Sequence, residues 1–207
     1  MLKQITIEGV RNLAHIQVAL PAGATVLFGA NGSGKTSFLE AIHLLAVGRS
    51  FRTHQSKPVI QHGVAHCRVV GEVQRGRRST VMGLEKHRDG NVKARVAGEN
   101  VPSLSELALH LPLVLLDTEG LGIVTGPPEG RRRLLDGTLF HVEQGFLSQW
   151  KRYALAVRQR NSGLRRGILD SDKAWRHEIA ETGTLLTQQR QALVEKLADE
   201  LARLVPA

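Results

Sequence analysis

The 207-residue sequence predicts an α/β fold: a first lobe with a phosphate-binding loop and an antiparallel β layer, then a mainly helical second lobe. Three observations predict it. A glycine-rich loop at 29–36 lies between a short apolar run and a helical pattern. Strand-like segments separated by turns fill residues 64–101. Helical spacing of apolar residues dominates from about residue 141 onward. We expect the first lobe to span residues 1–116 and the second 117–207.

The composition is that of a globular protein with an anionic partner. The 28 Lys and Arg residues exceed the 19 Asp and Glu residues, which gives a formal charge of +9, and most of the cations are Arg. Since the Arg fork binds phosphate bidentately, this balance indicates nucleic acid. The single cysteine, Cys67, excludes an intramolecular disulfide, and the N-terminus lacks the apolar stretch of a signal peptide. We therefore expect a cytoplasmic protein without membrane contact.

The first 28 residues are expected to form strands that lead into the loop. Residues 4–8 alternate apolar with polar side chains, the period of a half-buried strand, and residues 16–20 repeat the pattern. After a Pro-Ala-Gly turn, residues 25–28 form a short apolar run, which predicts a strand entering the loop directly.

The loop matches the phosphate-binding pattern G-x-x-x-x-G-K-[ST] in Gly29, Ala30, Asn31, Gly32, Ser33, Gly34, Lys35 and Thr36. Glycines let backbone N–H groups turn toward phosphate oxygens, and the N-terminus of the following helix adds its positive dipole end. Lys35 is expected to reach the β and γ phosphates, and the Thr36 hydroxyl is expected to bind Mg²⁺. A helix should follow and end near Gly48. The loop therefore predicts ATP and Mg²⁺ as cofactors.

An antiparallel meander is predicted after the first helix. Its strands are residues 65–73, 79–87 and 93–101, separated by the turns QRGRR and RDGN. The capping pattern Ser103-x-x-Glu106 then predicts the start of a short helix.

The second lobe is expected to contain helices at about 149–160 and 172–204. The longer one carries an apolar stripe of Leu186, Leu193, Leu197, Leu201 and Leu204.

A basic cluster opens another helical run in this lobe. Arg131, Arg132 and Arg133 follow two prolines, at a helix end whose dipole favours acids, so either phosphate or an acidic neighbour must compensate them. Lys151 and Arg152 extend the basic character along the next helix. Such spread cations predict contact with a DNA backbone rather than reading of bases.

The segment PLVLLD, residues 112–117, is expected to be a buried strand that ends in an acid. Asp117 would then be a Walker B acid on Mg²⁺, with Glu119 orienting water. This arrangement leads to an alternative function, a compact P-loop phosphotransferase or NTPase that is active by itself. A third hypothesis is a basic DNA-binding module with a vestigial loop, which a direct ATP-binding measurement would separate from the other two.

Three quoted segments together resemble the RecF family, the recombination-mediator ATPases of bacteria in the ABC-type class that includes SMC proteins. They are LKQITIEGVRNL, FGANGSGKTSFLEAIHLLAVGRSFR and TEGLGIVTGPPEGRRRLLD. The chain departs from the family at Thr118, where Pro is usual, and at Leu134, where an aromatic residue is usual. In the family's pattern Asp117 ends a strand entering the second lobe and is not the Walker B acid.

This resemblance implies an ABC-type ATPase lobe that forms an ATP-dependent homodimer on double-stranded DNA. It further implies work with RecO and RecR to direct RecA loading at single-strand gaps, with ATP as a switch. Arg11 and Asn12 stand where related ATPases approach the nucleotide, although a polar turn pair would explain them equally well.

The resemblance also implies motifs that are not found between residues 1 and 207. These are the signature loop, the Walker B Asp-Glu pair, the D-loop and the switch histidine. We therefore expect an N-terminal fragment, incomplete at the C-terminus, that binds ATP without hydrolysing it.

Overall fold

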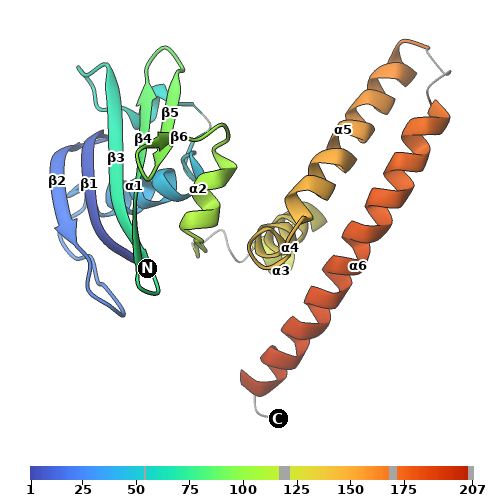
Figure 1. Ribbon diagram of the computed structural model, residues 1–207. Helices are drawn as coiled ribbons and strands as arrows, with labels where there is room; N and C mark the ends of the chain where they lie inside the picture. The colour runs from blue at the N-terminus through green and yellow to red at the C-terminus, as the bar shows by residue number, and fades with distance from the viewer. Residues whose placement is uncertain (54, 117–121, 168–171, 205–207) are drawn as a thin grey trace. The chain divides into compact units, whose positions relative to one another are not determined.

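The computed structural model describes most of the chain, namely residues 1–53, 55–116, 122–167 and 172–204. The chain divides into two compact units, Met1–Leu115 and Leu116–Ala207 (Figure 1). In the described ranges, no helix is both long enough and apolar enough to cross a bilayer.

An antiparallel sheet forms one layer of the first unit (Figure 1). Its strand order is β2-β1-β3-β4-β5-β6, so β1 is paired on both sides, with β2 and with β3. The two N-terminal strands and the first two strands of the predicted meander are confirmed, whereas the predicted third strand, residues 93–101, is divided by a turn at 97–98 into two strands. The strands are β1 (Leu2–Val10), β2 (Leu13–Ala19), β3 (His66–Arg75), β4 (Arg78–His87), β5 (Val92–Val96) and β6 (Glu99–Asn100).

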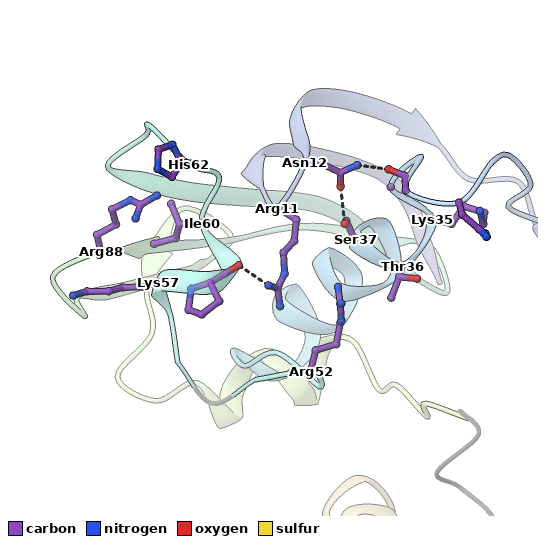
Figure 2. Close-up of a pocket in the computed structure, with 14 residues that line it drawn as sticks. Arg11, Asn12, Lys35, Thr36, Ser37, Arg52, Lys57, Ile60, His62 and Arg88 are labelled. Atoms are coloured by element: carbon purple, nitrogen blue, oxygen red, sulfur yellow. Dashed lines mark hydrogen bonds between the residues drawn. The ribbon is translucent and has the colours of Figure 1, made fainter.

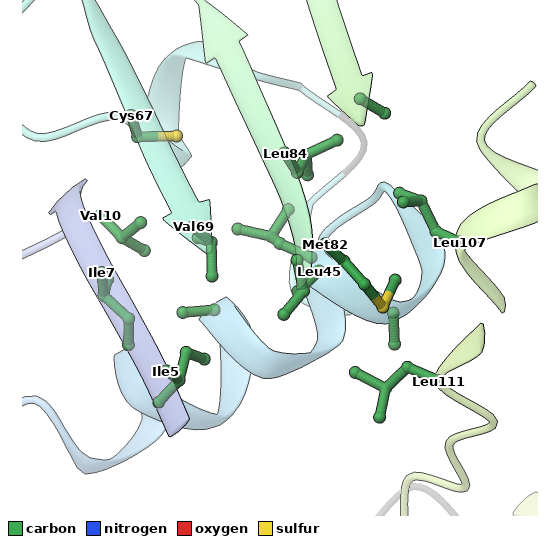
Figure 3. Close-up of a cluster of buried hydrophobic side chains, with 14 of the residues drawn as sticks. Ile5, Ile7, Val10, Leu45, Cys67, Val69, Met82, Leu84, Leu107 and Leu111 are labelled. Carbon is green, nitrogen blue, oxygen red and sulfur yellow. The ribbon is translucent and has the colours of Figure 1, made fainter. Parts of the chain in front are cut away.

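Helix α1 (Lys35–Val47) packs against the apolar face of this sheet (Figure 3). Leu44 and Leu45 on the helix are fully buried in the same cluster as Ile5 and Ile7 of β1. The contact is close, because a Cβ added to Gly71 of β3 would lie 2.5 Å from Leu45 Cδ2. The predicted end of the helix is confirmed: Gly48 adopts φ 74° and donates its N–H to the Leu44 carbonyl.

Two short helical elements complete the first unit, η1 (Lys57–Val59) and α2 (Ser105–His110). Helix α2 confirms the predicted short helix, but the capping pattern that predicted it does not form. The Ser103 hydroxyl accepts from the N–H of Ser105 at 3.4 Å, whereas the N–H of Glu106 donates to the Ser103 carbonyl at 3.0 Å.

Two segments predicted as strands are not strands. Residues 25–28 and 112–116 carry strand-like apolar runs, yet neither pairs with another strand in the described part of the chain. Both edges of β1 are occupied, so the run before the loop has no neighbour there, and Phe28 is 91% exposed. Leu116 is 84% exposed, and Asp117, the predicted end of the second run, lies outside the described residues. A β-strand requires a partner for its backbone groups, which an apolar sequence alone does not supply.

The second unit is helical, as predicted. A small core joins Leu139, Phe146, Leu186 and Leu193. The predicted stripe on the last helix is therefore buried only in part, because Leu201 and Leu204 are exposed. The helices are α3 (Gly122–Thr125), α4 (Pro128–Val142), α5 (Phe146–Arg165) and α6 (Asp172–Leu204).

Truncating the α1 contact with the sheet is expected to destabilise the first unit. Leu45→Ala removes a fully buried side chain and should lower the free energy of unfolding by about 2–5 kcal/mol. Leu39→Ala is the matched control, since Leu39 lies on the same helix but is half exposed, and should cost about 1 kcal/mol or less. Urea unfolding followed by circular dichroism measures both values. Equal losses would mean that the Leu45 side chain does not hold the helix on the sheet.

Candidate nucleotide-binding site

The loop before α1 has a backbone that only glycine adopts readily at three positions. Gly29, Gly32 and Gly34 have φ angles of 146°, 81° and 100°. At Gly34 space is also limiting, because an added Cβ would lie 2.6 Å from Leu13 Cδ2. The glycines of the predicted motif are therefore required by the conformation of the loop.

The start of α1 presents unused hydrogen-bond donors. The first N–H groups of a helix have no partner within the helix, and the first turn of α1 contains no acid that would neutralise its positive dipole end. The Lys35 ammonium donates to the carbonyls of Gly29 and Ala30, both at 2.8 Å. An ammonium has three N–H donors, so one remains for a ligand. These groups make the loop a site for an anion such as phosphate.

Asn12 connects the turn between β1 and β2 to this loop (Figure 2). Its amide Nδ2 donates to the Gly32 carbonyl at 2.8 Å, and its Oδ1 accepts from the Ser37 hydroxyl at 2.8 Å. One side chain therefore holds both the loop and the first turn of α1.

The position of Asn12 depends on its neighbour Arg11, whose guanidinium binds a buried carboxylate. Arg11 Nε and Nη2 donate to the two oxygens of Glu40 at 2.9 and 2.8 Å, and Nη1 donates to the Pro58 carbonyl at 2.6 Å. Glu40 is fully buried on α1 and also accepts from the Ser50 hydroxyl. Arg52 lies 3.6 Å away from the same carboxylate.

These partners keep Glu40 ionised. Burial alone would raise the pKa of the Glu40 carboxyl, but the hydrogen bonds from Arg11 and Ser50 and the charges of Arg11 and Arg52 outweigh it. The pKa of Glu40 is therefore lower than its ordinary value, and the Glu40 hydrogen bond raises the pKa of Arg11.

A cavity of about 750 Å³ opens in front of the loop (Figure 2). In the described part of the chain, the residues that line it include several cations and no Asp or Glu. Its walls come from the β1–β2 turn, the loop, the start of α1 and the segment after residue 51. The lining residues are Arg11, Asn12, Asn31, Gly32, Gly34, Lys35, Thr36, Ser37, Arg52, Lys57, Pro58, Ile60, His62 and Arg88.

The structure places Arg11 and Asn12 on the wall of the cavity, and their approach to a nucleotide stays a prediction. Both line the cavity, but the side chains bind Glu40 and the loop itself, so they position the site as well as face it. Sequence reasoning missed Glu40. Its signal was its spacing with Ser37, Ala41 and Leu44, which puts a carboxylate on the buried face of α1.

The predicted DNA-contacting cations all lie in the second unit, where most have internal partners. Arg131 donates to the carbonyls of Ile123 and Gly126, each at 3.0 Å. Arg132 and Arg133 bind Glu129 in the first turn of α4, at 3.1 and 3.4 Å.

Along α5, Arg152 binds Glu178 of α6 at 2.8 Å. Lys151 is exposed and makes no side-chain hydrogen bond or ion pair in the described ranges. Glu129 therefore compensates part of the positive charge at the start of α4, and a phosphate contact, the other alternative that the sequence left open, stays a prediction.

One side chain of the site, that of Thr36, has an oxygen that could bind Mg²⁺. The Thr36 hydroxyl lines the cavity and makes no hydrogen bond within the described residues, so its oxygen is available. In those residues no group of three or more His, Cys, Asp or Glu side chains could hold a metal ion. The remaining ligands would then be phosphate oxygens and water. Asp117 and Glu119, the alternative metal site, lie outside the described residues.

The family model and the individual proteins that are similar to this chain point to the same family. Residues 1–161 match the family described as the RecF/RecN/SMC N terminal domain. The chain is 42% identical over 199 residues to the DNA replication and repair protein RecF of Stutzerimonas stutzeri (strain A1501), which covers 95% of this chain and 54% of that protein. Identity to the protein of the same name in Azotobacter vinelandii (strain DJ / ATCC BAA-1303) is 41%, with the same coverage. The chain therefore spans about half the length of the curated relatives it matches.

Solved structures agree with this result. The structure described as the recombination mediator protein RecF-ATPrS in RecFOR pathway matches with a TM-score of 0.87 and 26% identity, over 98% of this chain and 56% of that chain. A structure from work on ATP-driven dimerization and DNA stimulated activation of SMC ATPases matches with a TM-score of 0.54 at 19% identity, over 66% of this chain and 98% of that chain. These matches confirm the predicted fold class.

The buried ion pair is expected to contribute pH-dependent stability. Glu40→Gln removes the charge that Arg11 binds and should lower the free energy of unfolding by about 1.5–3 kcal/mol at neutral pH. Because the folded-state pKa of Glu40 lies below its ordinary value of 4.5, this contribution is complete above that value and is lost as the pH falls through the lowered pKa. Wild type and variant should converge in acid. Urea unfolding over a pH series measures the difference.

Glu8→Gln is the control for this experiment. Glu8 lies on β1 and is 42% exposed, with only His15 nearby at 3.6 Å, so its replacement should change stability little at neutral pH. A loss in Glu40→Gln that is independent of pH would contradict the assignment, because it would reflect packing of the amide rather than loss of the charge.

Proposed function

The chain belongs to the RecF/RecN/SMC N-terminal domain family, and from this premise we propose that it is the ATP-binding, N-terminal part of a RecF-type protein of DNA repair. The observation that carries the proposal is the phosphate loop with Lys35, which opens on a cavity that no Asp or Glu lines in the described part of the chain. A triphosphate needs such donors and such a charge. The structures of RecF with ATP and with ATPrS, to which this chain is similar, support ATP as the ligand.

Each element of the site has a role in holding the triphosphate. The free N–H groups at the start of α1 and the third N–H of Lys35 bind phosphate oxygens. Asn12 keeps Gly32 in place, and Arg11, fixed by Glu40, keeps Asn12 in place. Mg²⁺ held by Thr36 would neutralise part of the charge on the β and γ phosphates.

Hydrolysis needs groups that this cavity does not supply in the described residues. A water molecule must be oriented or deprotonated for attack, and a carboxylate is the usual residue for that task. None lines the cavity. We therefore propose that this site holds ATP as a switch, and that turnover requires groups from outside it.

The wider activity follows from the family and is also proposed. RecF-type action would be an ATP-dependent homodimer on double-stranded DNA that works with RecO and RecR and assists RecA loading at gaps. The name of the curated relatives, DNA replication and repair protein RecF, and the RecFOR pathway named for the similar structure support this placement.

We place a DNA contact on the start of α4 and on α5. Arg132 and Arg133 share a single acid, Glu129, so an excess of positive charge remains there. Exposed ion pairs of this kind contribute little stability, so phosphate oxygens can compete for the guanidinium groups. Lys151 on α5 adds a charge that no acid pairs with among the residues that the structure describes.

Loss of the loop lysine is expected to weaken ATP binding. Lys35→Ala removes a charge-assisted contact to phosphate worth about 1.5–3 kcal/mol, which corresponds to a tenfold or larger rise in Kd. Lys93→Ala, on the exposed face of β5, removes the same charge away from the cavity and should leave Kd unchanged. Calorimetric titration with MgATP measures both variants. Equal affinity of the Lys35→Ala variant and the wild type would remove the basis for ATP as the ligand.

The salt dependence of duplex binding is expected to come in part from the α4 cations. Arg132→Gln with Arg133→Gln should weaken binding at low salt and reduce the slope of log K against log salt by about 2, since each phosphate contact contributes about 0.9. Lys196→Gln with Arg203→Gln on α6 lowers the net charge equally and should keep the slope. Fluorescence anisotropy with a labelled duplex measures it. An unchanged slope in the α4 variant would assign these arginines to internal pairing with Glu129.

A further inference from the structure

The end of the cavity away from the loop carries cations that ATP does not explain. Figure 2 shows Lys57, His62 and Arg88 grouped at one end, with Lys35 and Thr36 at the other. A triphosphate bound at the loop would place its negative charge at the Lys35 end of the cavity. The ribose and base that extend from it are uncharged, so they do not compensate the opposite end.

Arg88 is held in a fixed position by neutral partners. Its Nε donates to the Val64 carbonyl at 2.7 Å, and its Nη2 donates to the Gln61 carbonyl at 2.8 Å. Its backbone N–H also donates to the Ala65 carbonyl, so the whole residue is fixed to the 61–65 segment. The carbonyls orient the guanidinium without neutralising it, and part of its donor capacity remains free.

Lys57 adds a second positive charge beside Arg88. Both residues line the nucleotide cavity and also an adjoining hollow of about 430 Å³, and the carboxylate residue Asp89 borders that hollow but not the nucleotide cavity. In the described ranges, no carboxylate pairs with either residue. The acid nearest in sequence, Asp89, accepts hydrogen bonds from Asn91 N and Nδ2 at 2.9 and 2.8 Å.

We propose that Lys57 and Arg88 form a second anion subsite, separate from the phosphate loop, that binds a phosphate ester. A guanidinium with fixed orientation matches phosphate geometry, and an ammonium beside it supplies a further charge. His62 borders the same end and offers one more donor. The proposal rests on the proposed ATP binding only in assigning the other end of the cavity to the triphosphate.

The phosphate ester has two possible sources with the same chemistry. It is either a phosphate on the ribose of the bound nucleotide or a phosphodiester of a nucleic acid that reaches the mouth of the cavity. Two probes separate them: ATP carrying an additional 3′-phosphate, and a short DNA duplex added in the presence of saturating MgATP.

The test compares wild type with the variants Lys57→Gln and Arg88→Lys. Lys93→Gln is the control, because it removes a lysine charge elsewhere in the same unit. Calorimetry gives Kd for ATP and for 3′-phosphorylated ATP, and anisotropy gives Kd for the duplex. Lys57→Gln should lose about tenfold in affinity for one of the two phosphate-ester probes and keep its ATP affinity within about twofold. Arg88→Lys keeps the charge but loses the fork and should show a smaller loss for the same probe, with thermal melting verifying its fold.

The outcomes distinguish this subsite from the proposed ATP site. A loss confined to the 3′-phosphorylated nucleotide assigns a ribose phosphate, and a loss confined to the duplex assigns a phosphodiester. Equal behaviour of Lys57→Gln and Lys93→Gln with both probes overturns the subsite. A tenfold loss of ATP affinity in Lys57→Gln also overturns it, because the cation would then serve the triphosphate. Failure of wild type to bind ATP would reject the proposed function. The duplex titration would still test whether Lys57 and Arg88 bind a phosphodiester.

Discussion

The buried ion pair between Arg11 and Glu40 is the interaction on which the nucleotide site depends. A carboxylate without accessible surface is very costly unless charged partners and hydrogen bonds compensate it, and Arg11 supplies two such bonds. The pair fixes the β1–β2 turn against α1, and the same turn presents Asn12 to the loop. The conformation of the phosphate loop is therefore determined partly by a residue of α1 that never reaches the cavity.

The same pair connects the segment after residue 49 to the site. Ser50 donates to Glu40 and accepts from the backbone N–H groups of Arg52 and Thr53, and Arg11 donates to the Pro58 carbonyl. This segment continues into the part of the chain that brings Lys57 and Ile60 to the cavity wall. One buried charge thus positions both walls of a cavity whose own lining contains no acid in the described residues. The resulting positive field favours a ligand with several negative charges.

Charge in the second unit is balanced in a different way. Arg132, Arg133 and Arg152 pair with acids on the surface, where water competes and each pair contributes little stability. Such cations remain exchangeable, unlike Arg11, whose partner is shielded from water. Arg11 is therefore a positioning residue, whereas Arg132, Arg133 and Arg152 are, as proposed, available for contact with a polyanion.

The sequence by itself determined the elements whose signals are local. The alternation in β1 and β2, the glycine pattern of the loop, the helix that ends at Gly48 and the helices α4, α5 and α6 were predicted, because period and turn chemistry are properties of neighbouring residues. Only the tertiary structure decided which apolar runs become strands. Residues 25–28 and 112–116 have strand-like sequences, but in the described part of the chain no neighbouring strand accepts their backbone hydrogen bonds. It also decided the partners of Arg11, Asn12 and Arg88, since an ion pair or a carbonyl contact between residues twenty or more positions apart has no signature in the sequence.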